Sequence, residues 1–465
     1  MAISRANRVG LGDAIVMGLS SSGPSQTIAV SLAGLVAVSG YGGVVPILIC
    51  FVPMMGIALA YRRLNRWDQS AGATYTWVAR VFHPYLGFMS GWMILLYYTL
   101  GTTTLTIPAG IYTLQLIAPS LIEHHGAIFL VGALWNLVVT ALAILGLKIV
   151  ARFEWAIVLF EYAVLIGVAA LAIVALRQGH TAASFSWQWF SWNGVGRLKG
   201  LSGGLLIACF MYSGWDAAIY VNEETIDRAN NPGRAALASV VMLAFVYSLA
   251  TVAFQGVLPP SELQAHAGNA LSAVGAQLLP APWDAAMALV VLTGTLASLQ
   301  SAVVSATRMG FAMSRDEVMP RFFLRQTQAG SPWAATLTMS ALNLMLLALA
   351  LGTSSIAAAL SNAASSLGLI SIVFYGVTAA AALKQQRLVD RSSTRQRVLA
   401  GMLPLLGLVF SLWVLCASIL SGAVSGTVLL YGLGSIALGA VVAFILHRTR
   451  AVAFFAPRPR IASCR

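Results

Sequence analysis

The chain has 465 residues, of which 59% are hydrophobic and only 9% are charged, and its mean hydropathy is +0.83. Charged residues make up about a quarter of an ordinary soluble domain, so this composition excludes one and predicts an integral membrane protein. The net charge of +13 would suggest a nucleic-acid partner in a soluble chain, but in a membrane protein it reports on topology.

Apolar runs long enough to cross a bilayer follow one another along the whole chain. A membrane-spanning helix needs about 20 residues, and nearly every run reaches that length. The pattern therefore predicts an all-α membrane protein with twelve transmembrane helices, some of them long enough to tilt or bend. The predicted spans are 10–36, 41–61, 85–117, 126–147, 153–176, 200–222, 234–258, 283–314, 333–350, 354–383, 398–421 and 425–447.

Basic residues are distributed very unevenly between the connecting segments. If the N-terminus lies in the cytoplasm, all but three of the 27 Lys and Arg residues fall on the cytoplasmic side, the exceptions being Arg177, Arg197 and Lys199. This asymmetry obeys the positive-inside rule and predicts cytoplasmic N- and C-termini in a multi-pass protein of the cell membrane. The basic charge thus indicates orientation, and no nucleic-acid partner is expected.

Two of the predicted helices are interrupted, the first at 18–24 (GLSSSGP) and the sixth at 212–216 (YSGWD). Unwound backbone is tolerated at membrane depth only where protein buries it or where it lines a watery cavity, and breaks in matching places indicate a transporter's binding site. Their separation by five helices predicts two inverted five-helix repeats, 10–176 and 200–383. Helices within 398–447 and a basic tail, 448–465, complete a single transporter domain, 1–465.

The first break offers polar groups to a ligand. Ser20, Ser21 and Ser22 supply hydroxyl groups, and Gly23 allows a ligand to approach the backbone closely. The free N–H groups at the start of the following half-helix favour an anion such as a substrate carboxylate. The alternative is a Ser/Gly/Pro kink that only bends a helix.

Two carboxylates are predicted to lie at the depth of the breaks. Glu161 lies nine residues after Arg152 in the fifth helix, and Asp216 lies in the sixth-helix break. Acids at that depth are costly and seldom face lipid, so each is a functional candidate, although each could instead stitch helices or cap unwound backbone. Glu223 and Glu224 lie nearer the cytoplasmic end and are predicted to form an inner gate or a capping pair.

Other polar residues give weaker indications. Most hydroxylated side chains in membrane helices only join neighbouring helices, so few of these residues are candidates for the pocket. We single out Tyr98 in the third helix and Asn362 in the tenth. The six His and four Cys residues are scattered, and they predict neither a metal site nor a disulfide framework. Between helices five and six, the aromatic run 185–192 predicts a short interfacial helix or gate cover, or a plain membrane anchor.

Three further segments resemble one known family. They are 70–77 (SAGATYTW) with 84–92 (PYLGFMSGW), then 214–216 (GWD) with 223–225 (EET), and 306–316 (ATRMGFAMSRD) followed by Pro320. In this order they resemble signatures of the amino acid–polyamine–organocation permeases, and the resemblance covers essentially the whole chain.

The resemblance implies the leucine-transporter-type fold, with two inverted five-helix repeats and broken helices 1 and 6. It also implies import or exchange of amino acids, polyamines or related organic amines by alternating access, without an enzymatic reaction or a cofactor. By analogy, the break at Ser20–Gly23 would hold the substrate carboxylate. The second break would supply carbonyl groups, an aromatic lid and a countercharge for the amine, from Tyr212, Ser213, Gly214, Trp215 and Asp216.

The chain departs from the family at Glu161. Proton-coupled members often carry a lysine at the corresponding place in the fifth helix, so the lysine-based coupling cannot be carried over. Three roles remain for Glu161: a proton carrier, which is the first choice, a countercharge for a polyamine or cationic amino acid, or a ligand for Na⁺. The remote alternatives are a channel and a membrane sensor, but neither a repeated filter nor a soluble output domain is evident. The sequence does not indicate an oligomeric state.

Overall fold

The computed structural model describes residues 8–191, 198–266, 269–283, 285–352, 356–389, 394–420, 422, 424, 426–449 and 452–455. In this part of the chain, ten helices are long and apolar enough to cross a membrane. Their bounds lie close to ten of the twelve predicted spans. They are α3 (Val44–Trp67), α5 (Pro84–Ile117), α6 (His125–Leu145), α7 (Leu147–Gln178), α10 (Asn231–Phe254), α13 (Ala285–Arg315), α14 (Trp333–Leu351), α15 (Ile356–Val389), α16 (Thr394–Leu420) and α17 (Gly426–Thr449).

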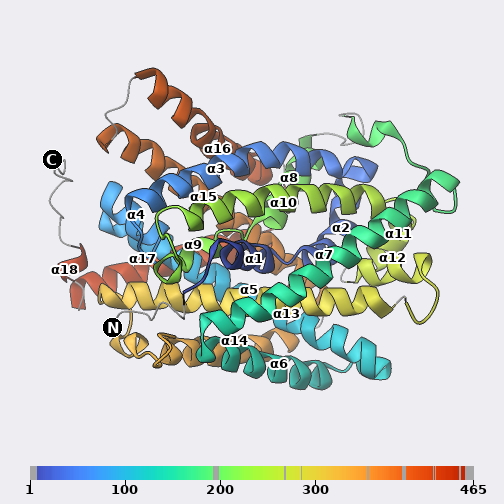
Figure 1. Cartoon of the computed structure of the whole chain (residues 1–465), viewed down its shortest axis with the longest axis horizontal. Coiled ribbons are helices and arrows are strands. Elements are labelled where there is room, and N and C mark those ends of the chain that lie inside the picture. Colours follow the sequence, from blue (N-terminus) through green and yellow to red (C-terminus); the bar gives the residue numbers. More distant parts are fainter. Residues whose placement is uncertain are drawn as a thin grey trace.

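The other two predicted spans, the first and the sixth, are divided. The first consists of α1 (Leu11–Ser22) and α2 (Pro24–Ser39), and the sixth consists of α8 (Leu198–Tyr212) and α9 (Ala217–Tyr220). Both interruptions therefore occur where the sequence predicts them. The half-helices lie in the middle of a bundle of long helices, while α6, α14 and α16 lie at its edges (Figure 1).

The two divided helices run in opposite directions. α1 packs against α9, and α2 packs against α8. Val9, just before α1, also forms a β-bridge with Thr225, which follows α9. The start of the first helix and the end of the sixth therefore meet at one end of the bundle, which we name the N-terminal face.

Glycine allows both interruptions. Gly23 has a φ of 47° and is followed by Pro24, which starts α2 at its first position. Gly214 has a φ of 106°, and a Cβ atom there would lie 2.9 Å from the backbone carbonyl carbon of Ser21. The backbones of the two breaks thus touch, and only a residue without a side chain fits between them.

Hydroxyl groups from neighbouring helices satisfy the carbonyl groups at the end of α1. On α13, Ser301 donates to the carbonyl of Met17 at 3.1 Å and Ser298 donates to that of Ser20 at 2.7 Å. Tyr247 on α10 donates to the carbonyl of Ser22 at 3.3 Å. The interruption is stable in this interior because these hydroxyls replace the missing helical hydrogen bonds.

Several short helices connect the long ones, and the sequence pattern predicts only the one in the aromatic run between helices five and six. The aromatic run between helices five and six contains a short 3₁₀ helix, in which Trp189 is buried and stacks on Tyr41 with 5.4 Å between ring centroids. Its neighbour Trp192 lies outside the described residues. The short elements are α4 (Thr74–Val81), α11 (Pro260–Ala265), α12 (Ala270–Leu278), α18 (Val452–Phe455), η2 (Gly40–Gly42), η3 (Pro119–Leu121), η4 (Trp187–Phe190), η6 (Asn222–Glu224) and η7 (Arg321–Leu324).

Candidate substrate and coupling site

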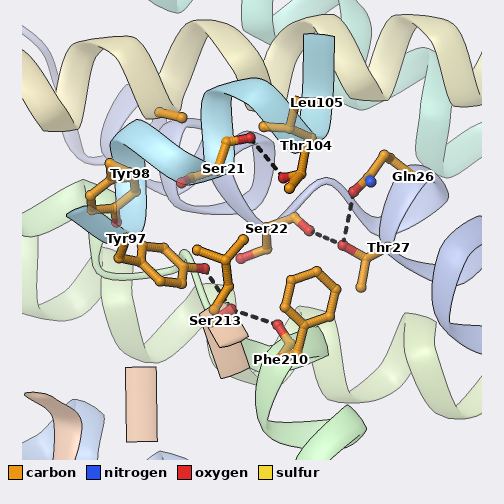
Figure 2. A pocket seen from close by; sticks show the side chains of 13 residues that line it. Ser21, Ser22, Gln26, Thr27, Tyr97, Tyr98, Thr104, Leu105, Phe210 and Ser213 are labelled. Atoms are coloured by element: carbon orange, nitrogen blue, oxygen red, sulfur yellow. Dashed lines mark hydrogen bonds between the residues drawn. The ribbon is translucent and has the colours of Figure 1, made fainter. Parts of the chain in front are cut away.

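A cavity of about 40 Å³ lies where the two breaks face α5. Figure 2 shows side chains from the first break, α5 and the end of α8 gathered around it. Its volume gives room for a few water molecules, so an amino acid or a polyamine requires the site to widen. The lining residues are Ser21, Ser22, Gln26, Thr27, Tyr97, Tyr98, Gly101, Thr104, Leu105, Phe210, Ser213, Ala302 and Leu367.

The lining combines hydroxyl and amide side chains with apolar ones and carries no charged side chain. Tyr97 donates to Ser213 Oγ at 2.7 Å, which fixes the second break against α5. Thr27 donates to the carbonyl of Ser22 at 2.6 Å, across the first break. Within the described residues, the hydroxyl of Ser21 has no hydrogen-bond partner. The cavity therefore offers hydroxyl and amide groups to a ligand, with aromatic side chains beside them.

Glu161 lies beside the first break but does not line the cavity. Its side chain on α7 is completely buried. The carboxylate Oε1 accepts a hydrogen bond from the backbone N–H of Ser25 at 2.6 Å and another from its hydroxyl at 2.5 Å. Gly294 on α13 makes room for this contact, since a Cβ there would lie 2.7 Å from the same oxygen. Glu161 thus caps the start of α2, where the positive end of the helix dipole favours a negative charge.

This cap changes the expected chemistry of the first break. The N–H of Gly23 donates to the carbonyls of Leu19 and Ser20, and the N–H of Ser25 is taken by Glu161. Pro24 has no N–H to offer. The backbone groups that were expected to bind a substrate carboxylate are therefore largely used within the protein. Ser21 and Ser22 both line the cavity, but the Ser22 hydroxyl donates to the carbonyl of Gly18 at 3.1 Å, so the Ser21 hydroxyl is the one of the two without a partner in the described residues.

Asp216 is held by three tyrosine hydroxyl groups. Tyr98 on α5 and Tyr375 on α15 donate to Oδ1 at 3.2 and 2.9 Å, and Tyr220 donates to Oδ2 at 2.8 Å. The carboxylate is fully buried and lies outside the cavity lining. Only Tyr98 both touches Asp216 and lines the cavity. Asp216 therefore ties the second break to α5 and α15.

The other candidates from the second break lie around Asp216. Trp215 stacks on Tyr375 with 5.4 Å between ring centroids, and Tyr212 donates to the carbonyl of Ile47 at 3.3 Å. Ser213 lines the cavity, whereas Tyr212, Gly214 and Trp215 do not. On α8, the aromatic side chain that lines the cavity is that of Phe210.

The remaining predicted pocket residues are divided in the same way. Ser21, Ser22 and Tyr98 line the cavity, whereas Ser20, Gly23 and Asn362 do not. Ser20 is fully buried next to the cavity wall, and Asn362 is partly buried on α15. The substrate-binding assignments of these residues stay predictions.

Glu223 and Glu224 form two ion pairs with α13 at the N-terminal face. Glu224 is paired with Arg308 at 2.9 Å, and both side chains are nearly buried. Glu223 accepts two hydrogen bonds from Arg315, at 2.6 and 3.2 Å, and one from the backbone N–H of Ala71 at 2.8 Å. These contacts join the end of the sixth helix to α13 and to the segment before α4.

The described residues contain no group of three or more His, Cys, Asp or Glu side chains that could hold a metal ion. Cys50 and Cys209 are buried free thiols with their sulfur atoms 3.7 Å apart, between α3 and α8.

Sequence reasoning missed several residues that the fold brings to the site. Tyr220 lies four residues after Asp216, a helical spacing that could have indicated the contact. Glu154 lies seven residues before Glu161 and could likewise have been placed on the same helix face. Ser25 and Tyr375 gave no such signal, because their partners are distant in the sequence.

The chain matches the model of the amino acid permease family over residues 10–446. It belongs to this family, within the amino acid–polyamine–organocation superfamily. The resemblance seen in the sequence is therefore confirmed, and the family consists of transporters, not enzymes.

Two similar proteins show how widely this family ranges. The chain is 26% identical to the low-affinity putrescine importer PlaP of Escherichia coli K12 over 295 residues, which are 60% of this chain and 61% of that protein. It is 24% identical to the human large neutral amino acids transporter small subunit 2 over 349 residues, 73% of this chain and 62% of that protein. The match thus spans about three-fifths of each relative's length.

Proposed function

We propose that the chain is a secondary active transporter that carries neutral amino acids by alternating access. The observation that carries this proposal is the uncharged, hydroxyl-rich cavity at the two helix breaks. A zwitterionic amino acid has no net charge and needs no unpaired countercharge at membrane depth, whereas a polyamine cation needs a carboxylate in the site. Relatives named as a large neutral amino acids transporter and as a putrescine importer make these the two substrate classes to compare.

The fold that we propose has twelve membrane spans in the leucine-transporter-type arrangement. Ten continuous helices and two oppositely directed, divided helices support it. The repeats would be 10–176 and 200–383, with 398–447 outside them. The distribution of basic residues supports a cell-membrane protein with the N-terminal face, both termini and the 448–465 tail in the cytoplasm.

Coupling to protons through Glu161 is the second part of the proposal. Buried beside the break and bound to Ser25, Glu161 can bind or release a proton and so change the cap of α2. Its absence from the cavity lining argues against the alternative in which it is the countercharge of a cationic substrate. A role for Glu161 in binding Na⁺ stays a further alternative, to be compared in the same assays.

Uptake into proteoliposomes tests the substrate class. We expect saturable uptake of radiolabelled leucine, with competition by other neutral amino acids and little competition by putrescine. The matched variant is Ser21→Ala, which removes a cavity hydroxyl that has no protein partner and should raise KM with little loss of stability. Uptake of putrescine in preference to every amino acid tested would overturn the assignment, and conductance of many ions per opening would indicate a channel.

The pH dependence of uptake tests the coupling. An inward proton gradient should accelerate uptake by the wild type, and Glu161→Gln should remove this acceleration because the amide cannot exchange a proton. Replacing Na⁺ with choline at constant pH should have no effect. If Glu161→Gln keeps the pH profile and the substrate preference of the wild type, both the proton and the countercharge roles fail.

A further inference from the structure

A second buried acid, Glu154, lies on α7 between Glu161 and the start of the helix. The side chain of Glu154 is completely inaccessible to solvent, and within the described residues neither carboxylate oxygen has a hydrogen-bond partner. It belongs to the buried stripe of α7, which also contains Val150, Ile157 and Glu161. Trp155, Leu159 and Phe160 lie on the outer side of the helix. Both acids therefore point into the bundle and away from lipid.

The position of Glu154 relates Glu161 to the N-terminal face. Seven residues separate the two acids, which places them on one face about 10.5 Å apart along the axis of an α-helix. Glu154 is the nearer to the start of α7, and its neighbour Trp155 donates to Asp13 of α1 at 3.0 Å. Asp13 is partly exposed at the N-terminal face. Glu154 thus lies between this face and Glu161.

No ionised partner explains why Glu154 is buried. The helices packed most closely against α7 are α1, α2, α6, α10, α12 and α13. Of their charged groups, Arg308 and Arg315 are paired with Glu224 and Glu223, and Asp13 binds Trp155. Within the described residues, Glu154 makes no ion pair with any of them. The titratable side chains on these six helices are Asp13, His125, Arg234, Tyr247, Arg308 and Arg315, and those of α7 itself are Lys148, Arg152, Glu154, Glu161, Tyr162 and Arg177.

We propose that Glu154 is a proton-relay residue between Glu161 and the N-terminal face. The proposal rests on the proton-coupled function proposed above. Glu154 is protonated while it is buried without a partner in the described part of the chain, and it first passes this proton to water at the N-terminal face. The Glu154 carboxylate then accepts the proton that the Glu161 carboxyl releases, and Glu161 becomes a carboxylate held by Ser25. Because 10.5 Å exceeds one hydrogen bond, the proton crosses through intervening water or hydroxyl groups. The proton route follows α7 and stays separate from the substrate cavity.

The test compares net uptake with exchange in proteoliposomes. Exchange of internal for external leucine needs no net proton release, whereas net uptake does. Glu154→Gln should lower proton-driven net uptake by about tenfold or more, as expected when a proton-transferring group is removed. It should leave exchange within about twofold of the wild type, and Glu154→Asp should restore much of the net uptake because it keeps a carboxyl group.

The outcomes separate this proposal from the proposed function. If Glu154→Gln leaves net uptake unchanged, or lowers exchange as much as net uptake while Glu154→Asp restores neither, the relay is wrong. If Glu161→Gln itself keeps proton-driven uptake, the proton-carrier function fails first.

A measurement on the wild type covers the case in which the variants do not fold. Dicyclohexylcarbodiimide modifies protonated carboxyl groups in apolar surroundings. We expect modification at Glu154, found by mass spectrometry, which rises as the pH on the N-terminal side falls and blocks net uptake before exchange. Absence of modification at every pH would overturn the relay.

Discussion

At the scale of single residues, the two buried acids near the breaks, Glu161 and Asp216, have different hydrogen-bond environments. Glu161 has one oxygen bound to Ser25 and, within the described residues, one oxygen without a partner, so its environment can accept a change of protonation. Asp216 has both oxygens bound by tyrosine hydroxyls, and its carboxylate form is the one that this set of donors fits. These contacts support the proposed coupling role of Glu161, and for Asp216 we propose a structural role.

Substitution of Asp216 tests this difference. Asp216→Asn replaces an acceptor oxygen with an NH₂ group that faces a tyrosine donor, and should lower the free energy of unfolding by about 1.5–3 kcal/mol. Tyr220→Phe, which removes a single hydroxyl, should cost less, about 0.5–1.5 kcal/mol. Thermal melts of the purified variants measure both. Equal stability of Asp216→Asn and the wild type would show that the three hydrogen bonds do not require a carboxylate.

At the scale of elements, the two divided helices form one unit because their breaks touch. A side chain at Gly214 would meet the backbone of Ser21, and one at Gly23 would lie 2.0 Å from Ser298 Oγ. Movement of either break is therefore transmitted to the other and to α13. Alternating access requires such coupled elements, since the cavity must open to one side while the other side is closed.

Gly214→Ala should disrupt this unit. The φ of 106° strains any residue with a side chain by about 1–3 kcal/mol, and the contact with Ser21 adds to that cost. We expect a lower melting temperature and loss of leucine uptake. The control is Gly167→Ala in α7, where a Cβ meets nothing within 4 Å and the substitution should be neutral or slightly stabilising. Normal uptake by Gly214→Ala would mean that the breaks have more room than their contact indicates.

At the scale of the whole molecule, segments far apart in the sequence are joined at the N-terminal face. The Glu224–Arg308 pair is the most buried of the ion pairs found in the described residues, and the Val9–Thr225 bridge lies beside it. The proposal that Glu223 and Glu224 form an inner gate rests on these ion pairs.

Breaking the buried pair should be costly. Arg308→Gln leaves Glu224 without its partner and should lower the free energy of unfolding by about 3–5 kcal/mol. The double variant, Glu224→Gln with Arg308→Gln, should lower the free energy of unfolding by less than the sum of the two single variants. In the exposed pair of Arg321 and Glu317, Arg321→Gln should cost about 1 kcal/mol or less. Thermal melts of these four variants measure the coupling. Additive effects of the two buried substitutions would exclude an energetically significant pair.

Much of the fold is determined by the sequence alone, because a bilayer admits few solutions. Long apolar runs form spanning helices in a bilayer, and Ser-Ser-Ser-Gly-Pro and Tyr-Ser-Gly-Trp-Asp mark the two places where these helices are interrupted. The sequence likewise predicts the breaks, the family and the buried position of Glu161. Only the tertiary structure decides which groups those residues meet. Ser25 donates hydrogen bonds to Glu161, and three tyrosines from α5, α9 and α15 donate to Asp216. Arg308 forms an ion pair with Glu224. Apart from Tyr220, which lies four residues after Asp216, these partners come from helices that pack together only in the folded bundle, and local periodicity carries little information about them.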